Sequence, residues 1–193
     1  LLDWYSVHGR DFPWRKKDVD SYLLLVAEVL LKKTGAASAA TILEKCMEHY
    51  PTPLCLGHAD ETDLATLLKP IGLNVQRARQ LKKLGQALGE RLTAPSSADD
   101  LIELPGIGPY TAAMVSAVCF GEAKVGLDTN IARVFRRLFG LQKTRAEERR
   151  SPEFWHLGEM LAREAGRSVA DLNWALIDLG ALICRPISPQ CSD

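Results

Sequence analysis

The sequence lacks an excess of charge of either sign, because 24 lysines and arginines stand against 24 aspartates and glutamates. The chain as a whole therefore gives no electrostatic indication of a nucleic-acid partner, and any such indication must be local. Basic clusters do occur, such as Lys32-Lys33 and Arg136-Arg137. A solvated helix face explains any single cluster more readily than a binding site does.

Long apolar runs and low-complexity linkers are also missing. No run reaches the roughly 18 to 20 residues of a membrane span and no signal peptide is visible, so we expect no membrane association. The chain begins at Leu1 rather than methionine, which leaves a processed leader open. With 193 residues, 47% of them hydrophobic, the chain can form one large globular domain or two small ones.

Alternating patterns typical of strands and hairpins are absent too, and almost every periodic segment indicates a helix. The predicted fold class is all-α. The expected helices are Leu1–His8, Ser21–Lys33, Ala37–His49, Thr62–Leu68, Val75–Glu90, Ala98–Leu104, Pro109–Phe120, Thr129–Phe139, Pro152–Ala165 and Val169–Cys184.

The cysteines are odd in number, five in all. Cys46, Cys55 and Cys119 lie in apolar contexts and are expected to be reduced core residues of a cytosolic protein. Cys184 and Cys191 enclose six residues, two of them prolines. That spacing suggests half of a four-thiolate metal or iron–sulfur site.

The segment Leu104–Thr111 predicts a tight turn between two helices. Gly106 and Gly108 can adopt backbone angles closed to other residues and leave the amides bare, while Pro109 suits a first helical position. Such a helix N-terminus binds anions, including the phosphates of nucleic acid. An ordinary glycine-containing turn explains the local pattern equally well.

Two shorter patterns accompany this turn. Residues 67–73 repeat its order of helix, proline-glycine turn and helix, and so offer a second place where a helix pair can approach a charged backbone. Ser97 and Asp100 are spaced like a capping box.

Two carboxylates stand in unusual places. Glu28 is the one charge in the ten residues 22–31, so it lies either on a narrow polar stripe or at an interior site with a raised pKa, as a general acid requires. Asp128 precedes a basic helix and is expected to be its N-cap. The same location also suits a carboxylate that stabilises a developing cation.

Three segments together, Leu104–Thr111, Leu127–Val134 and the Cys184/Cys191 pair, resemble the helix-hairpin-helix DNA glycosylases of the endonuclease III superfamily. The resemblance extends over nearly the whole chain. It also includes Gly9–Arg15, Glu28–Thr34, Ile71–Arg79 and Asn173–Cys184.

This resemblance implies an enzyme that bends duplex DNA, extrudes one nucleotide into a cleft between two helical domains and breaks its N-glycosidic bond. A six-helix domain would occupy residues 21–125, with the helix-hairpin-helix at 101–120. Residues 1–20 and 126–193 would form the second domain. The implied partner of this monomer is double-stranded DNA containing a mismatch, in a nucleoid, a nucleus or an organelle.

The resemblance also assigns catalytic roles. Asp128 matches the catalytic aspartate, and Asn130 would help to position water or sugar. Tyr110 stands where bifunctional relatives have a lysine; a phenol forms no imine, so we expect a monofunctional enzyme. Glu28 would contact the flipped base.

DNA and metal contacts follow from the same resemblance. The residues expected to meet DNA are Lys32, Lys33, Leu73, Gln76, Arg77, Gly106, Gly108 and Thr111. The backbone carbonyls of Ile102, Leu104 and Ile107 would hold Na⁺ or K⁺ beside a phosphate. A [4Fe–4S] cluster would use Cys184 and Cys191, two ligands of the four that it needs.

The subfamilies of these glycosylases differ in the base that they excise. Adenine-mismatch enzymes share Glu28, Tyr110 and Asp128 with this chain, but usually have two glutamines in place of Lys32-Lys33. That basic pair favours the enzymes that remove thymine or uracil opposite guanine. A non-catalytic DNA-binding module and a purely structural helical domain are the alternatives from other classes.

Overall fold

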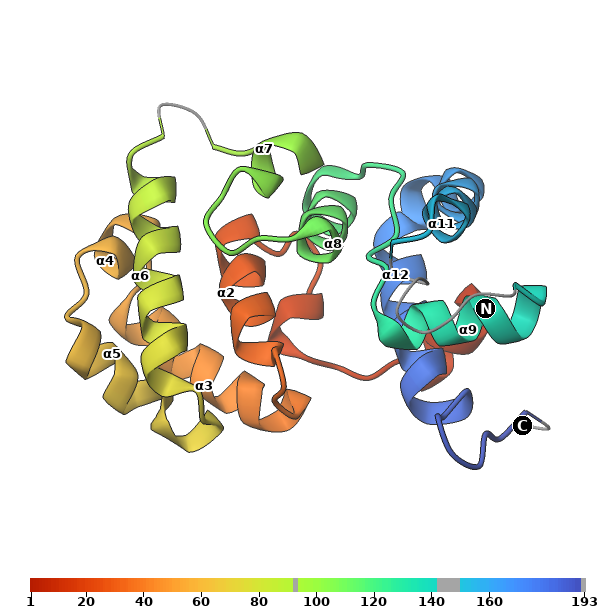
Figure 1. Ribbon diagram of the computed structural model, residues 1–193, viewed down its shortest axis with the longest axis horizontal. Helices are drawn as coiled ribbons and strands as arrows, with labels where there is room; N and C mark the ends of the chain where they lie inside the picture. The colour runs from red at the N-terminus through yellow and green to blue at the C-terminus, as the bar shows by residue number, and fades with distance from the viewer. Residues whose placement is uncertain (92–93, 142–149, 192–193) are drawn as a thin grey trace. The chain divides into compact units, whose positions relative to one another are not determined.

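The computed structural model describes residues 1–91, 94–141 and 150–191, and these form helices with no strand among them (Figure 1). The all-α prediction is confirmed. Within these ranges no helix is both long enough and apolar enough to cross a bilayer.

The chain divides into two compact units. Unit 1 combines Leu1–Asp11 with Pro109–Asp193, and unit 2 is Phe12–Gly108. This division differs from the expected one, which placed residues 12–20 with the chain ends and residues 109–125 with the other domain. The two helices of the predicted hairpin therefore fall in different units.

Unit 2 is built around a helix that is apolar on all sides except at Glu28. In α2 (Ser21–Leu31) every residue from Leu24 to Leu30 is buried, as expected for a helix enclosed by others. The side chain of Asp20 caps it by accepting a hydrogen bond from the Tyr22 amide. The other elements of the unit are η1 (Pro13–Arg15), α3 (Ala36–His49), α4 (Pro53–Gly57), α5 (Glu61–Leu68), η2 (Lys69–Ile71), α6 (Asn74–Gly89) and α7 (Ala98–Ile102).

The sequence prediction missed α4, because five residues are too few for a periodic pattern. Thr52 caps this helix, and α4 then packs closely on α6. A Cβ on Gly85 would lie only 2.5 Å from the Gly57 nitrogen, so glycine is required at this contact.

Unit 1 is organised around α12 (Val169–Asp178), which contacts α1 (Leu2–His8), α8 (Pro109–Phe120), α9 (Thr129–Phe139) and α11 (Pro152–Ala165). Short segments η3 (Gly166–Ser168) and η4 (Leu179–Ile183) flank α12. Its core includes Ile131, Phe135 and Phe154, each with none of its surface exposed. Arg10 and the buried Asp178 form an ion pair at 2.7 Å that joins the N-terminal segment to α12.

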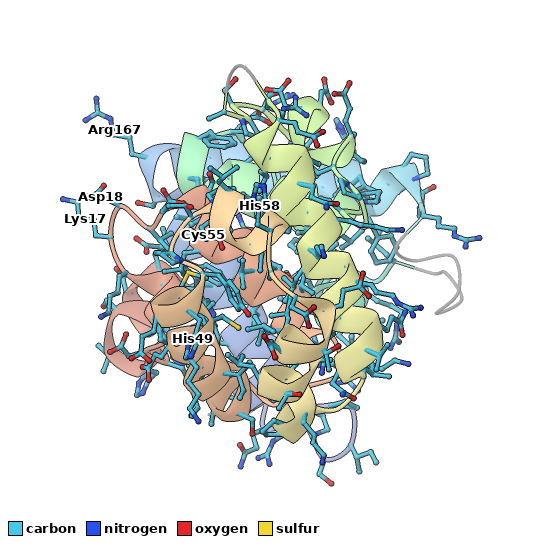
Figure 2. The ribbon with its side chains drawn as sticks, turned by 90° about the vertical axis from the view of Figure 1, so that its left-hand side faces the viewer. Lys17, Asp18, His49, Cys55, His58 and Arg167 are labelled. Atoms are coloured by element: carbon cyan, nitrogen blue, oxygen red, sulfur yellow. The ribbon has the colours of Figure 1, made fainter. Side chains whose placement is uncertain are left out.

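Two smaller predictions have mixed outcomes. The Ser97 hydroxyl accepts a hydrogen bond from the Asp100 amide, as in a capping box, and the Asp100 carboxylate accepts the Ser96 amide at 3.0 Å. Among the cysteines, Cys46 is buried as expected. Placing Cys55 in the core was wrong, because it lies exposed on α4 at the surface of unit 2 (Figure 2).

Candidate active site

In unit 1 the carboxylate of Asp128 is held by three donors. Its Oδ1 accepts the backbone amides of Asn130 and Ile131, at 2.8 and 2.7 Å, and its Oδ2 accepts the Asn130 side-chain amide at 2.8 Å. The predicted N-cap is thus confirmed. Asp128 as a residue is only half-buried.

Asn130 is itself held in one orientation. Its Oδ1 accepts a hydrogen bond from Arg133 at 3.0 Å, which leaves its nitrogen to donate to Asp128. The almost fully buried Arg133 also donates to the carbonyls of Gly180, at 2.7 Å, and Cys184, at 2.8 Å. A Cβ on Gly180 would lie 3.1 Å from that of Asn130, so a larger residue at position 180 would press on Asn130.

The sequence analysis assigned no role to Asn173. Its side-chain amide, placed within a mostly apolar helical segment, was a usable signal for one. Asn173 is fully buried on α12. Its Oδ1 accepts from the Gly126 amide at 2.9 Å, and its Nδ2 donates to the carbonyls of Lys124 and Val169, at 3.0 and 2.9 Å. These bonds fasten the loop that leads into Asp128.

Tyr110 lies half-buried in the first turn of α8. A Cβ on Gly126 would approach its ring carbon Cε2 to 3.2 Å, so the Tyr110 ring rests against the loop that Asn173 holds. The side chain of Thr111 is buried. The predicted contact of Thr111 with DNA therefore has almost no exposed surface in this structure.

In unit 2 Glu28 lies at an interior site rather than on a polar stripe, with 4% of its surface exposed. Lys32 follows one turn later. Burial lowers the pKa of the Lys32 ammonium, and the charge of Glu28 opposes that effect. The Lys32 Nζ donates to the Gly106 carbonyl at 3.2 Å, so this predicted DNA contact reaches the hairpin turn of its own protein.

The hairpin glycines differ from each other. Gly106 has the positive φ of 76° that was expected, and a Cβ there would meet the Gln80 side chain at 2.6 Å. Gly108 uses no positive φ, so the expectation of a special backbone angle was wrong for it. Nothing lies within 4 Å of a Cβ built at Gly108, which leaves open space in front of its backbone.

Around the proposed cation site, the Leu104 carbonyl accepts the Ile107 amide at 3.1 Å. The side chains of Leu104 and Ile107 are buried, whereas that of Ile102 is 46% exposed.

The remaining residues predicted to contact DNA differ in how far their side chains are exposed to solvent. Lys33, Leu73 and Gln76 are exposed. Arg77 is not, because its guanidinium is buried against backbone carbonyls of unit 2. A guanidinium buried in this way does not reach DNA, so that expectation for Arg77 was wrong.

The described residues do not fit an iron–sulfur cluster by themselves. Cys184 is buried, with its Sγ 3.5 Å from Arg137, and Cys191 is exposed. Within the described ranges, no three metal-ligating side chains gather in one place. A [4Fe–4S] cluster takes four cysteine thiolates.

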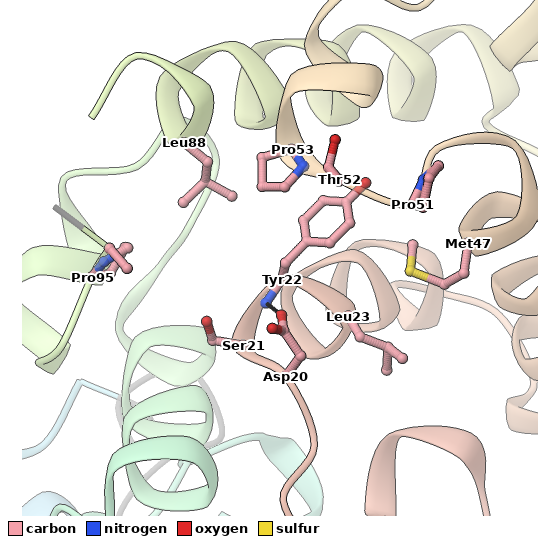
Figure 3. A pocket seen from close by; sticks show the side chains of 11 residues that line it. Asp20, Ser21, Tyr22, Leu23, Met47, Pro51, Thr52, Pro53, Leu88 and Pro95 are labelled. Atoms are coloured by element: carbon pink, nitrogen blue, oxygen red, sulfur yellow. Dashed lines mark hydrogen bonds between the residues drawn. The ribbon is translucent and has the colours of Figure 1, made fainter. Parts of the chain in front are cut away.

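Unit 2 also contains a cavity. It measures about 520 Å³, opens in unit 2 and is lined by Tyr22, Met47, Pro53, Leu88 and neighbouring side chains (Figure 3). The Tyr22 hydroxyl donates to the Tyr50 carbonyl at 2.7 Å, and burial raises the pKa of its phenol. None of the candidate residues predicted from the sequence is among the described residues lining it.

Comparison with known proteins assigns the family. Residues 26–160 match the model of the HhH-GPD superfamily base excision DNA repair proteins. The chain belongs to the HhH-GPD superfamily. A thymine-DNA glycosylase of Aeropyrum pernix is 31% identical over all of this chain and 87% of its own length. The human adenine DNA glycosylase is 32% identical over all of this chain but only 36% of its own length.

A solved structure gives the same result for the fold. The structure of a thermostable thymine-DNA glycosylase matches this HhH-GPD chain with a TM-score of 0.89 and 33% identity, over 100% of this chain and 88% of that one. The resemblance inferred from the hairpin and the Asp128 segment is thereby confirmed. This HhH-GPD protein is an enzyme of base excision DNA repair.

Proposed function

We propose that this enzyme is a monofunctional mismatch glycosylase that removes thymine or uracil paired with guanine. The observation that carries the proposal is the carboxylate of Asp128, half-buried at a helix N-terminus and oriented by Asn130. Base excision needs a fixed negative charge beside a sugar that becomes cationic, and this arrangement supplies one.

The proposed reaction is hydrolysis. The bond between the sugar C1′ and the base nitrogen breaks, and its electron pair leaves with the base. Asp128 stabilises the resulting oxocarbenium-like sugar and accepts a proton from the water whose oxygen then bonds to C1′. That proton passes to the departing base. Because Asn130 donates to Asp128 Oδ2, it keeps the carboxylate turned in one direction during these steps.

Tyr110 supports the monofunctional assignment. Strand cleavage by bifunctional relatives requires an amine that forms a Schiff base with the sugar, and a phenol has none. The product would therefore be an intact strand with an abasic site. Glu28, buried at its interior site, would hydrogen-bond the edge of the extruded base.

The choice of base follows from similarity and from the Lys32-Lys33 pair. Relatives that match this chain over most of their length carry names of thymine and thymine/uracil glycosylases. Adenine is the second candidate, since Glu28 also suits protonation of an adenine ring and the human adenine enzyme is 32% identical.

The deciding experiment is a glycosylase panel on duplexes carrying G·T, G·U, A·8-oxoguanine and A·G pairs. We expect excision of thymine and uracil opposite guanine, without strand cleavage. Preferred release of adenine would support the second candidate. DNA binding without release of any base would support a non-catalytic module.

Partners and cofactors complete the proposal. The enzyme would act as a monomer on mismatched duplex DNA in a nucleoid, a nucleus or an organelle. Na⁺ or K⁺ would bind the carbonyls of Ile102, Leu104 and Ile107 beside a phosphate. Cys184 and Cys191 would contribute to a [4Fe–4S] cluster only together with further thiolates; iron content and visible absorption test this.

A further inference from the structure

The side chain of Arg77 joins two turns of unit 2 that are far apart in sequence. It is 97% buried on α6, as its exposed fraction is 3%. Its Nη1 donates to the carbonyls of Ile71 and Gly72, at 2.6 and 2.5 Å. Its Nη2 donates to the Lys32 carbonyl and, at 2.6 Å, to the Thr34 hydroxyl. One planar guanidinium thus spans both turns.

Each of these turns presents an exposed residue in a conformation that L side chains rarely adopt. Lys33 has a φ of 57° and Leu73 a φ of 48°. Non-glycine residues persist in this region only where the surroundings hold them. Arg77 binds the residues on both sides of Lys33 and the carbonyl just before Leu73, so it supplies that hold.

The same face of α6 holds a third turn. Gln80, three residues after Arg77, donates to the Gly106 carbonyl at 3.2 Å, and Lys32 donates to the same oxygen. Each of the two proline-glycine turns noted in the sequence is therefore held through the carbonyl of its glycine. Arg77 donates to the Gly72 carbonyl. Gln80 donates to the Gly106 carbonyl.

We propose that Arg77 is a positioning residue that locks Lys33 and Leu73 into one rigid wedge, which fills the gap in the duplex when a base is extruded. The proposal rests on the proposed function. Side chains that enter a base stack must replace lost stacking, and two turns ordered in advance lose less conformational freedom on binding. Arg77 serves the reaction through these turns and does not touch the phosphate backbone.

Arg79 offers a matched control on the same helix. Its side chain is 66% exposed and pairs with Glu61 at 3.4 Å, so Arg79→Met removes the same charge as Arg77→Met but no bond to either turn. The probe is a G·T duplex with 2-aminopurine beside the thymine, whose fluorescence rises when stacking is lost. Base unstacking and single-turnover excision are measured with each variant, as is the salt dependence of DNA affinity.

We expect Arg77→Met to slow unstacking and excision at least tenfold, with a salt dependence of affinity equal to that of the parent protein. Arg79→Met should leave both rates within twofold. Arg77→Lys keeps the positive charge but loses the planar guanidinium whose two nitrogens reach both turns. It should therefore behave like Arg77→Met. Equal losses in the two methionine variants, or full activity of Arg77→Lys, would show that Arg77 acts as a charge and would overturn the proposal.

Amide hydrogen exchange in the DNA-free protein separates this inference from the proposed function. The amides of Thr34 and Gly72 bond to the carbonyls of Leu31 and Lys69 within the two turns. Arg77→Met should speed exchange at both amides while the amides of α2 stay protected. Unchanged exchange would contradict the proposal that Arg77 holds the two turns, even if the enzyme excises thymine. Faster exchange would support it even if the excised base proves to be adenine.

Discussion

Asn173 holds the Gly126 backbone two residues ahead of Asp128, through a hydrogen bond of 2.9 Å from the Gly126 amide to its Oδ1. The same side chain donates to Lys124, so one buried amide fastens both ends of a three-residue stretch. Since the Tyr110 ring rests on Gly126, Asn173 sets the position of two residues proposed to serve catalysis.

Replacing Asn173 by aspartate should therefore slow excision. The variant keeps the acceptor for Gly126 but loses both donated bonds, and small displacements of catalytic groups cost up to about 100-fold in rate. Single-turnover excision of thymine is the measurement. Leu176→Ala, a core change on the same helix, controls for lost stability; an equal fall in its rate would argue against a positioning role.

Asp128→Asn should reduce excision by about 1,000-fold or more, because the developing positive charge loses its counter-charge. DNA affinity should stay close to that of the parent protein. Asp60→Asn is the matched control, since Asp60 caps α5 through the amides of Thr62 and Asp63 in the way that Asp128 caps α9. Excision retained by Asp128→Asn would remove this carboxylate from the mechanism.

Tyr110→Lys should introduce strand cleavage, because its amine can form a Schiff base with the sugar. Borohydride treatment during turnover should then trap a covalent complex between the variant and DNA. Tyr110→Phe serves as the control and should give none. Absence of trapping with the lysine variant would show that position 110 does not reach the sugar carbon.

Asp178→Asn should destabilise unit 1 strongly. Asp178 is fully buried and accepts three hydrogen bonds from Arg10, and removal of one partner of such a pair typically costs about 3–5 kcal/mol. Denaturant unfolding measures the change in free energy. Glu159→Gln, which breaks an exposed pair with Arg163, should cost less than about 0.5 kcal/mol. A similar cost for the two variants would contradict the prediction.

The cysteines should differ in reactivity. Burial raises the pKa of Cys46 to about 12, so its thiol stays protonated at pH 8 and should resist iodoacetamide. The exposed Cys55 should react under the same conditions, as mass spectrometry of the labelled peptides can measure. In denaturant Cys46 should react as well. Equal labelling rates in the native protein would place Cys46 in contact with solvent.

Most helices were predictable because the apolar period and the capping residues are local properties of the chain. Asp128 is an example: its place before a helix predicted the cap that its two amide hydrogen bonds confirm. The errors arose where packing decides. α4 is too short to show a period, and Cys55 has apolar sequence neighbours yet lies exposed on that helix.

The sequence by itself determined the all-α class, the family and the residue types available for chemistry, since each depends on patterns within short segments. Only the tertiary structure decided what those side chains do. Arg77 and Lys32 look alike in a basic sequence, but one guanidinium is buried beneath two turns while the ammonium bonds the hairpin carbonyl. Partners from 45 and 74 residues away make that difference, and no local pattern encodes contacts over such separations.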